Sequence, residues 1–418
     1  MLSEFANGFK VTELRNRVIF TLVMFCFFRL GAHIPVPGVN AEVIEQLFNN
    51  GSLFGMLDMF SGGALSKFSI FAMSITPYIN ASIILQLLKA VVPVLDQWSK
   101  EGEEGFKKTN KLTRQFTVVL CFVQALGMAY GLRMAINNPG IASMLMIALT
   151  LTAGTMLLMW IGEQMTVRGL GNGISLIIFA GIVSRLPDGL KVIYEYLNAG
   201  TVNLVNVILF AVLALAIIIF VIMITEGIRK IPIQYAKRIV GHKSYGGSSS
   251  YLPMKINQAN VIPVIFASSV LMFPATIAQF VNVPAVRNFA EYLRWGSPLQ
   301  TTLYVLLIIF FTFFYTAVMM NVKDLSENLK KNGGFIPGVR PGQPTADYLD
   351  GVMSRITMAG AIFLAIIALT PNVVAGITHI EGIYFGGTAL LIVVAVALDT
   401  LKQAESMVIM RHYHGFMK

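Results

Sequence analysis

Long runs of apolar residues follow one another along this chain, and they have no polar face. Examples are VIFTLVMFCFF, which begins at Val18, and LFAVLALAIIIFVIMI, which begins at Leu209. A helix that is apolar on all sides is buried in a large core or in lipid, and crossing a bilayer takes about 20 mostly apolar residues. Ten segments approach or reach this length: 17–34, 64–92, 114–134, 143–164, 173–187, 204–225, 256–281, 302–322, 355–374 and 384–400. The pattern predicts an all-α polytopic membrane protein with ten transmembrane helices.

Composition agrees with a membrane protein and excludes a soluble globular one. Of the 418 residues, 56% are hydrophobic and 12% are charged, whereas soluble domains carry about 25% charged residues. The two cysteines, Cys26 and Cys121, lie inside apolar runs, where they cannot link loops. The stretch Gly31–Pro37 lacks the small-residue pattern of a cleavage site, so we interpret the first run as a permanent span and not as a signal peptide.

The placement of lysine and arginine predicts the orientation. If the N-terminus is cytoplasmic, 23 of the 31 basic residues fall in inside segments and five in outside segments. Basic residues accumulate on the cytoplasmic side of membrane proteins, so we expect both termini to be cytoplasmic. Two inside loops, 226–256 and 323–355, are large and basic. They are either docking surfaces for partners or solvated loops that only set the orientation.

Ten spans with both ends inside divide into two halves of five, 1–200 and 201–418, which must run in opposite directions. This is the arrangement of an inverted repeat. The pattern P-x-I-x-A-S occurs in the second span, at Pro77–Ser82, and in the seventh, at Pro263–Ser268. Chance similarity between helices rich in alanine and isoleucine is the alternative explanation. If the match is genuine, the functional centre lies between these two helices.

The second span is irregular at its front. Residues 60–92 are too long for one straight crossing, and the first part holds Gly62, Gly63 and Lys67 before a break at Thr76-Pro77. Irregular backbone at membrane depth is tolerated only inside protein or beside water. We therefore expect a short half-helix that folds into a cavity from outside, followed by a true span.

Catalytic motifs are missing from the sequence. It contains no HExxH, no GxxxxGK[ST] and no paired membrane aspartates. The stretch Arg168–Gly173 superficially resembles a phosphate loop, but it follows no strand, and we interpret it as a tight inside turn. His412 and His414 could bind a metal, although a polar tail explains them more simply. We expect no cofactor, no metal and no enzymatic activity. The rival classes are a secondary transporter, which would need midplane charges that are missing, and an intramembrane enzyme.

Several blocks together make the family recognisable. They read FSGGALSKFSIFA from Phe60, TPYINAS from Thr76, GEQMTVRGLGNGIS from Gly162, VIPVIFASS from Val261, PGVRPG from Pro337 and YFGGT from Tyr384. In this order, over nearly the whole chain, they resemble the SecY/Sec61α family of protein-conducting channels in its bacterial form. The resemblance implies two pseudo-symmetric, inverted five-helix halves around a central hourglass pore. Unfolded preproteins would cross it, and transmembrane segments would leave it sideways into lipid.

The resemblance also implies site residues. A pore ring of aliphatic side chains would consist of Ile79, Ile83, Ile174, Ile178, Ile265 and Ile392. From the residues alone, the pairs Ile79/Ile83 and Ile174/Ile178 would more simply face lipid or a core. The plug segment would be Ser61, Gly62, Gly63, Ala64, Leu65, Ser66, Lys67, Phe68, Ser69, Ile70, Phe71 and Ala72. Its glycines and serines would suit a helix packed lightly enough to be displaced. The lateral gate would lie where the second and third spans meet the seventh and eighth, with Gln86 and Asn257 in polar contact across it.

Partners follow from the same resemblance. The docking residues would be Lys237, Arg238, Lys243, Lys330, Lys331 and Arg340. They would engage the SecA motor ATPase or the ribosome. The other implied partners are SecE and SecG subunits, signal peptides and preproteins, membrane lipids, and an association with SecDF/YidC. The implied location is the bacterial plasma (inner) membrane.

Overall fold

The fold was analysed on a computed structural model of the chain. It describes residues 12–40, 43–44, 58, 61–89, 91–235, 238–240, 243–245, 249–280, 297–378 and 387–416. The helices are α2 (Thr12–Gly31), α5 (Thr76–Lys89), α6 (Pro93–Lys100), α7 (Glu103–Gly131), α8 (Ile141–Arg168), α9 (Gly173–Ser184), α10 (Leu186–Asn198), α11 (Leu204–Glu226), α12 (Ile262–Phe280), α14 (Pro298–Met319), α15 (Val322–Lys331), α16 (Gln343–Thr378) and α17 (Gly387–Phe416). The strands are β1 (Ile228–Tyr235), β2 (Arg238–Val240), β3 (Lys243–Tyr245), β4 (Ser249–Lys255) and β5 (Gly334–Phe335).

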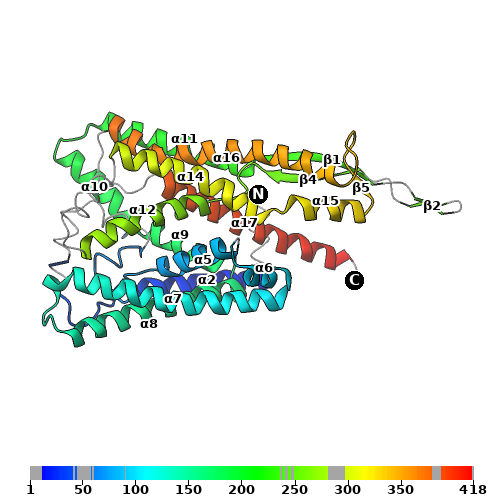
Figure 1. The fold of residues 1–418 in the computed structure, drawn as a ribbon. Helices are drawn as coiled ribbons and strands as arrows, with labels where there is room; N and C mark the ends of the chain where they lie inside the picture. The colour runs from blue at the N-terminus through cyan, green and yellow to red at the C-terminus, as the bar shows by residue number, and fades with distance from the viewer. Residues whose placement is uncertain are drawn as a thin grey trace.

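Each of the ten predicted spans contains a helix, and most of these helices run side by side along the long axis of the molecule (Figure 1). In the described ranges, α7, α8, α11, α16 and the α14–α15 stretch are long and apolar enough by themselves to cross a membrane. The helices often continue beyond the apolar run. For example, α7 begins at Glu103, eleven residues before the predicted span, because its charged first turns extend past the apolar part. The boundary near residue 200 falls between α10 and α11.

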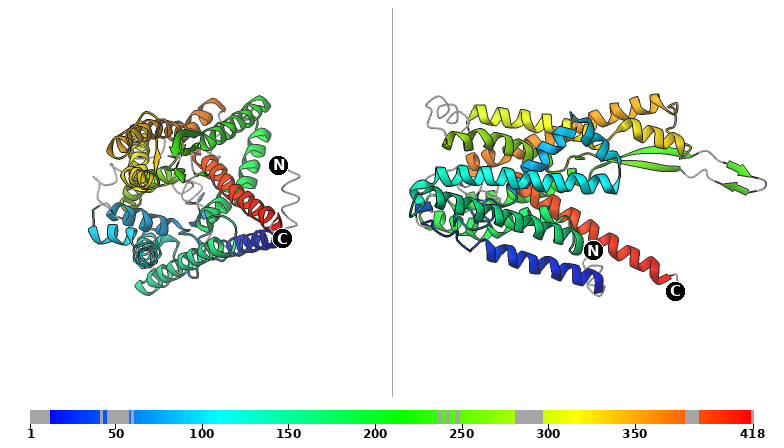
Figure 2. Two further views of the ribbon diagram at one scale, coloured as in Figure 1. Left: turned by 90° about the vertical axis from the view of Figure 1, so that its right-hand side faces the viewer. Right: turned by 60° about the horizontal axis from the view of Figure 1, so that its bottom comes forward.

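The two halves touch along two seams. On one side α12 packs against α5 and α7, and on the other α17 packs against α9 and α2. In the end-on view of Figure 2, α17 runs from the C-terminal half toward α2. By contrast, almost none of the side chains of α11 is buried, which is typical of a helix that faces lipid or a partner.

The tight turn predicted at 168–173 is confirmed, because α8 ends at Arg168 and α9 begins at Gly173. This turn also contacts α17 and so fastens the α17 seam. The amide of Gly171 donates a hydrogen bond to Oε1 of Gln403 on α17. Leu170 is buried in a small cluster with Leu14 of α2 and Ala404 of α17. Asn172 caps α9 by accepting hydrogen bonds from the next backbone amides, as a helix N-cap does.

The two P-x-I-x-A-S motifs occupy matching places in the fold. Pro77 is the second residue of α5 and Pro263 the second residue of α12, so Ile79 and Ile265 are each the fourth. Proline is tolerated in the first turn because its missing amide would be unpaired there. The motif therefore marks the start of corresponding helices in the two halves.

The two large loops that were predicted to be cytoplasmic contain more structure than the sequence indicated. β1 pairs in antiparallel fashion with β4 and with β5, so strands from 226–256 and 323–355 share one sheet. A separate hydrophobic cluster, including Ile231, Met254 and Leu349, lies under it. The segment β2–β3 extends away from the helices as a hairpin (Figure 2). We call the sheet, α15 and the turn at residues 336–342 the platform. It is a folded unit and not a pair of solvated loops.

The packing of α16 against the residue that follows β4, Ile256, can be tested with two glycines of α16. A Cβ at Gly360 would lie 2.7 Å from the carbonyl oxygen of Ile256, whereas one at Gly351 would meet nothing within 4 Å. We expect Gly360→Ala to cost about 1–3 kcal/mol because backbone must move. Gly351→Ala should instead stabilise the helix by up to about 1 kcal/mol. Thermal unfolding in detergent measures both, and shifts of the same sign would contradict the packing described.

Candidate functional site: plug segment and isoleucine cluster

The predicted break at Thr76-Pro77 is confirmed, but the predicted half-helix is wrong. Residues 62–75 form consecutive turns, and α5 begins only at Thr76. Gly62, Gly63 and Phe68 have φ of 66°, 85° and 43°, whereas an α-helix needs φ near −63°. An isolated bridge between Pro35 and Ser69 ties the turns to the chain that follows α2.

The plug segment is also packed tightly, contrary to the light packing expected from its glycines and serines. Lys67 is its exposed residue, while Leu65, Phe68 and Phe71 are 2–3% exposed. The ring of Phe71 stacks on Phe28 of α2, with centroids 6.3 Å apart and an interplanar angle of 9°. These bulky side chains fill the space that the small residues alone could not.

Glycines on the surrounding helices let the plug segment approach their backbones. A Cβ at Gly154 of α8 would overlap the carbonyl of Ile70, and one at Gly31 of α2 would overlap the ring of Phe71. Leu65 and Phe68 pack in a cluster with residues of α7 and α8. The plug segment is therefore enclosed by helices of the N-terminal half.

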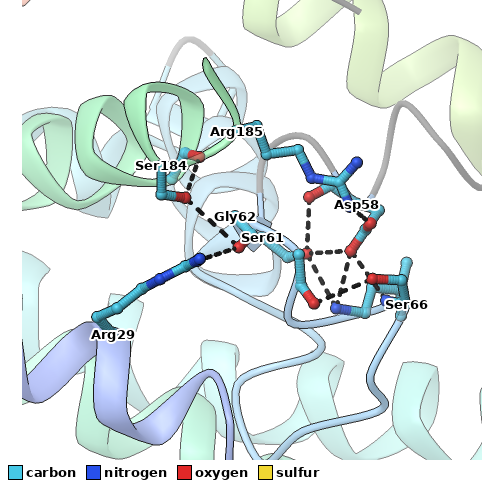
Figure 3. Close-up of polar contacts among 10 residues, drawn as sticks. Arg29, Asp58, Ser61, Gly62, Ser66, Ser184 and Arg185 are labelled. Atoms are coloured by element: carbon cyan, nitrogen blue, oxygen red, sulfur yellow. Dashed lines mark hydrogen bonds and ion pairs between the residues drawn. The ribbon is translucent and has the colours of Figure 1, made fainter. Parts of the chain in front are cut away.

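Polar contacts hold the front of the plug segment, and they centre on Asp58 (Figure 3). Oδ1 of Asp58 accepts hydrogen bonds from the amides of Leu65 at 3.0 Å and Ser66 at 2.9 Å. It also accepts one from the hydroxyl of Ser61 at 3.0 Å. Oδ2 forms an ion pair with Arg185. We call these five residues the Asp58 hub.

A second set of contacts meets at the carbonyl of Gly62. It accepts a hydrogen bond from Nη1 of Arg29 at 2.8 Å and one from the hydroxyl of Ser184 at 3.4 Å. The sequence predicts no role in the site for Asp58, Arg29, Ser184 or Arg185. The available signal is that Arg185 is one of the few basic residues predicted on the outside and that Arg29 lies near the end of an apolar run.

The six isoleucines predicted for the pore ring gather in one hydrophobic cluster. Ile83, Ile178 and Ile392 are buried there, and Ile79, Ile174 and Ile265 are partly buried against it. They come from α5, α9, α12 and α17, so both halves contribute. Ala64 and Phe71 of the plug segment belong to the same cluster. The six side chains therefore belong to one interior cluster to which both halves contribute.

The two predicted gate residues are not hydrogen-bonded to each other in the part of the chain that the structure describes. The amide of Gln86 donates to the hydroxyl of Ser82 on the same helix at 3.3 Å. Asn257 is 4% exposed in the bend before α12. Its amide nitrogen and oxygen have no hydrogen-bond partner among the described residues. The main helix contacts at this seam come from α12, against α5 and α7.

The predicted docking residues that the structure describes lie in the two large loops, 226–256 and 323–355. Lys330 and Lys331 end α15 and Arg340 follows β5, and all three are exposed. The carbonyl of Arg340 accepts a hydrogen bond from the hydroxyl of Thr345 at 2.8 Å, which fixes the turn. Arg238 lies in β2 and Lys243 in β3, whereas Lys237 lies outside the described residues. The structure therefore presents the three described side chains from one platform.

No group of three or more His, Cys, Asp or Glu side chains that could hold a metal ion occurs within the described ranges. The side chains of His412 and His414 lie outside them. The candidate site therefore consists of an irregular segment that helices enclose and of a cluster of aliphatic side chains to which both halves contribute.

Comparison with known proteins decides the family. The family model SecY matches residues 69–401. The chain belongs to the SecY family. The protein translocase subunit SecY of Halalkalibacterium halodurans is 48% identical over the full length of both chains. That of Escherichia coli K12 is 44% identical, over 97% of this chain and 94% of the relative.

Solved structures of SecY and Sec61 channels share the fold. A protein-conducting channel aligns with a TM-score of 0.64 at 17% identity, over 94% of this chain and 92% of that one. Sec61 in the canine ribosome-channel complex aligns with a TM-score of 0.63 at 16% identity, with the same coverage. A structure reported with the finding that the SecY plug domain stabilises the closed channel and maintains a membrane seal has a TM-score of 0.66. The membrane fold predicted from the sequence, with ten spans and the SecY/Sec61α resemblance, is confirmed.

The tight packing of the plug segment gives a direct prediction. Removing the ring of Phe71, which is buried against Phe28, should lower the free energy of unfolding by about 3–5 kcal/mol. Lys67→Ala, in the same segment but exposed, should leave it nearly unchanged. Unfolding in detergent, followed by tryptophan fluorescence, compares the two. Equal stability of Phe71→Ala and the unsubstituted protein would show that the segment is loosely held.

Proposed function

We propose that this chain is the protein-conducting channel of a Sec translocon, which passes unfolded preproteins across a membrane and releases transmembrane segments sideways into lipid. The proposal rests on one observation: the six isoleucines, which come from both halves, belong to the same hydrophobic cluster as residues of the plug segment. In this proposal the isoleucines are the pore ring and residues 61–72 are the plug.

The physical need is for a path that is wet when used and sealed when empty. An unfolded chain carries a donor and an acceptor at almost every residue, and each unsatisfied group in hydrocarbon costs several kcal/mol. A narrow apolar constriction excludes water and ions when nothing fills it. Aliphatic side chains can also yield around a passing chain without binding it. The plug segment adds a second closure on the outer side.

The sideways exit is proposed at the seam of α12 with α5 and α7. That seam consists of helix contacts, while the α17 seam adds the Gly171–Gln403 hydrogen bond and the buried cluster of Leu14, Leu170 and Ala404. Within the described residues, the α17 seam is therefore the more specifically fastened of the two, so we infer that the halves part at α12. An apolar stretch of about 20 residues that reaches the opening partitions into lipid, whereas a polar stretch continues through.

Directed movement comes from partners in this proposal, because the chain itself is a conduit and not an enzyme. Relatives of the fold have been solved on ribosomes, namely canine Sec61 and the yeast Ssh1 complex. We infer that Lys330, Lys331 and Arg340 on the platform engage a ribosome or the SecA ATPase. SecE and SecG subunits, signal peptides, lipids and SecDF/YidC complete the proposed partners. The proposed site is the bacterial plasma membrane, with both termini cytoplasmic.

Crosslinking to a trapped chain tests the channel. In a background without Cys26 and Cys121, single cysteines at Ile79, Ile265 and Ile392 should form disulfides with a cysteine in a stalled secretory chain. Ile219→Cys is the matched control, because this isoleucine of α11 is 58% exposed on the outside of the bundle. Gel mobility after oxidation is the readout. A folded protein that crosslinks at none of the three ring positions, or equally at Ile219, contradicts the proposal.

Charge reversal tests the docking surface. Arg340→Glu places a like charge against an acidic partner, which costs several kcal/mol, so motor-driven export should fall by more than about tenfold. Lys323→Glu, an exposed reversal at the start of α15, is the control. Export into membrane vesicles is measured beside the amount of assembled complex. Normal export by Arg340→Glu would remove this arginine from the docking surface.

A further inference from the structure

The Asp58 hub has a feature that a simple stopper does not require, namely a buried ion pair. The side chain of Asp58 is 2% exposed and that of Arg185 is 22% exposed. A charge in such a place is costly unless a partner and hydrogen bonds compensate it. Here both conditions are met, because one carboxylate oxygen faces Arg185 and the other accepts from two backbone amides and a hydroxyl.

The same carboxylate determines the shape of the plug front. The amides of Leu65 and Ser66 both point at Oδ1 of Asp58, and the carbonyl of Asp58 accepts from the amide of Gly63 at 3.1 Å. These bonds close the turn that replaces a helix at residues 62–66. The position of the turn relative to the helices is then fixed by Arg185 (Figure 3).

Arg185 lies in the N-terminal half, between α9, which ends at Ser184, and α10, which begins at Leu186. The helix α10 is the last described element before the chain enters the C-terminal half at α11. The contacts from Arg29 and Ser184 to Gly62, and the stacking of Phe71 on Phe28, also come from the N-terminal half. All of these contacts can persist while α12 moves away from α5 and α7.

We propose that Asp58 and Arg185 are positioning residues that hold the plug on the N-terminal half, so that parting the halves does not by itself release the plug. The inference rests on the proposed channel function. The plug is then carried with α2, α8 and α9 when the lateral seam opens. It leaves its seat only when the ion pair breaks. A gate could therefore open sideways toward lipid while the path across the membrane stays closed.

The test measures resting ion leak through the purified complex in planar bilayers. Asp58→Asn keeps an oxygen that can accept the hydrogen bonds from the two amides, but it removes the negative charge that faces Arg185. Arg185→Gln instead removes the positive charge that faces Asp58. Each single variant should raise the leak by about tenfold, because removing one partner strands a buried charge. Arg185→Lys, which keeps the charge, should leak less than Arg185→Gln. Asp188→Asn breaks an exposed pair with Lys191 three residues further on and is the matched control.

The double variant separates an ion pair from general damage. Because neither charge is left without its partner, the double variant Asp58→Asn with Arg185→Gln should leak less than either single variant. If the two substitutions damaged the protein independently, their effects on the leak would instead add. A double variant that leaks at least as much as the sum of the singles overturns the proposal. As a second measurement, Leu65→Cys in the background without Cys26 and Cys121 reports plug position. Its labelling by a maleimide added from outside should speed up in Asp58→Asn and not in Asp188→Asn.

Deletion of residues 61–72 distinguishes this inference from the proposed function. If the deletion raises the leak while both single variants remain tight and Leu65→Cys stays protected, the plug closes the channel but the ion pair does not position it. If the deletion leaves the conductance unchanged, the plug assignment itself fails.

Discussion

Backbone polar groups cannot be left unpaired at membrane depth, and the site described here depends on that constraint. Residues 62–75 are irregular, so they lack the repeating bonds that a helix makes within itself. Some of their groups are paired by turns within the segment, as where the amide of Ser69 donates to the carbonyl of Ala64. Others are paired by neighbours: the amide of Val36 donates to the carbonyl of Phe68, and the amide of Ile70 donates to the carbonyl of Ile34. The helices α2, α7, α8 and α9 exclude lipid from the segment. An irregular, displaceable element can exist in a membrane protein only inside such an enclosure.

The enclosure belongs to one half of the molecule, whereas the isoleucine cluster belongs to both. This difference separates two tasks that a polypeptide channel must perform. In the proposed channel, sealing against ions uses side chains from α5, α9, α12 and α17, which belong to one cluster. The polar contacts that hold the plug segment, from Arg29, Ser184 and Arg185, come from the N-terminal half. In the same proposal, the two halves can shift relative to each other while these contacts persist.

The two large loops are arranged differently. The platform has its own hydrophobic cluster, and the sheet joins strands from two segments about 100 residues apart in sequence. Lys330, Lys331 and Arg340 are therefore carried by a folded unit of the C-terminal half. In the proposed function, a partner that binds there contacts the same half that contributes α12 to the lateral seam.

The sequence by itself determined the ten helical segments, the break at Thr76-Pro77 and the matching motifs of the two halves. Apolar run length and proline position are local properties, so they can be read without knowing what each segment packs against. Only the tertiary structure decided that the plug segment is a series of tightly packed turns, that the cytoplasmic loops share a sheet, and that Asp58 pairs with Arg185. These features depend on contacts between residues far apart in sequence. Asp58 and Arg185 are 127 positions apart, and no local pattern indicates that two isolated charges will meet in a buried place.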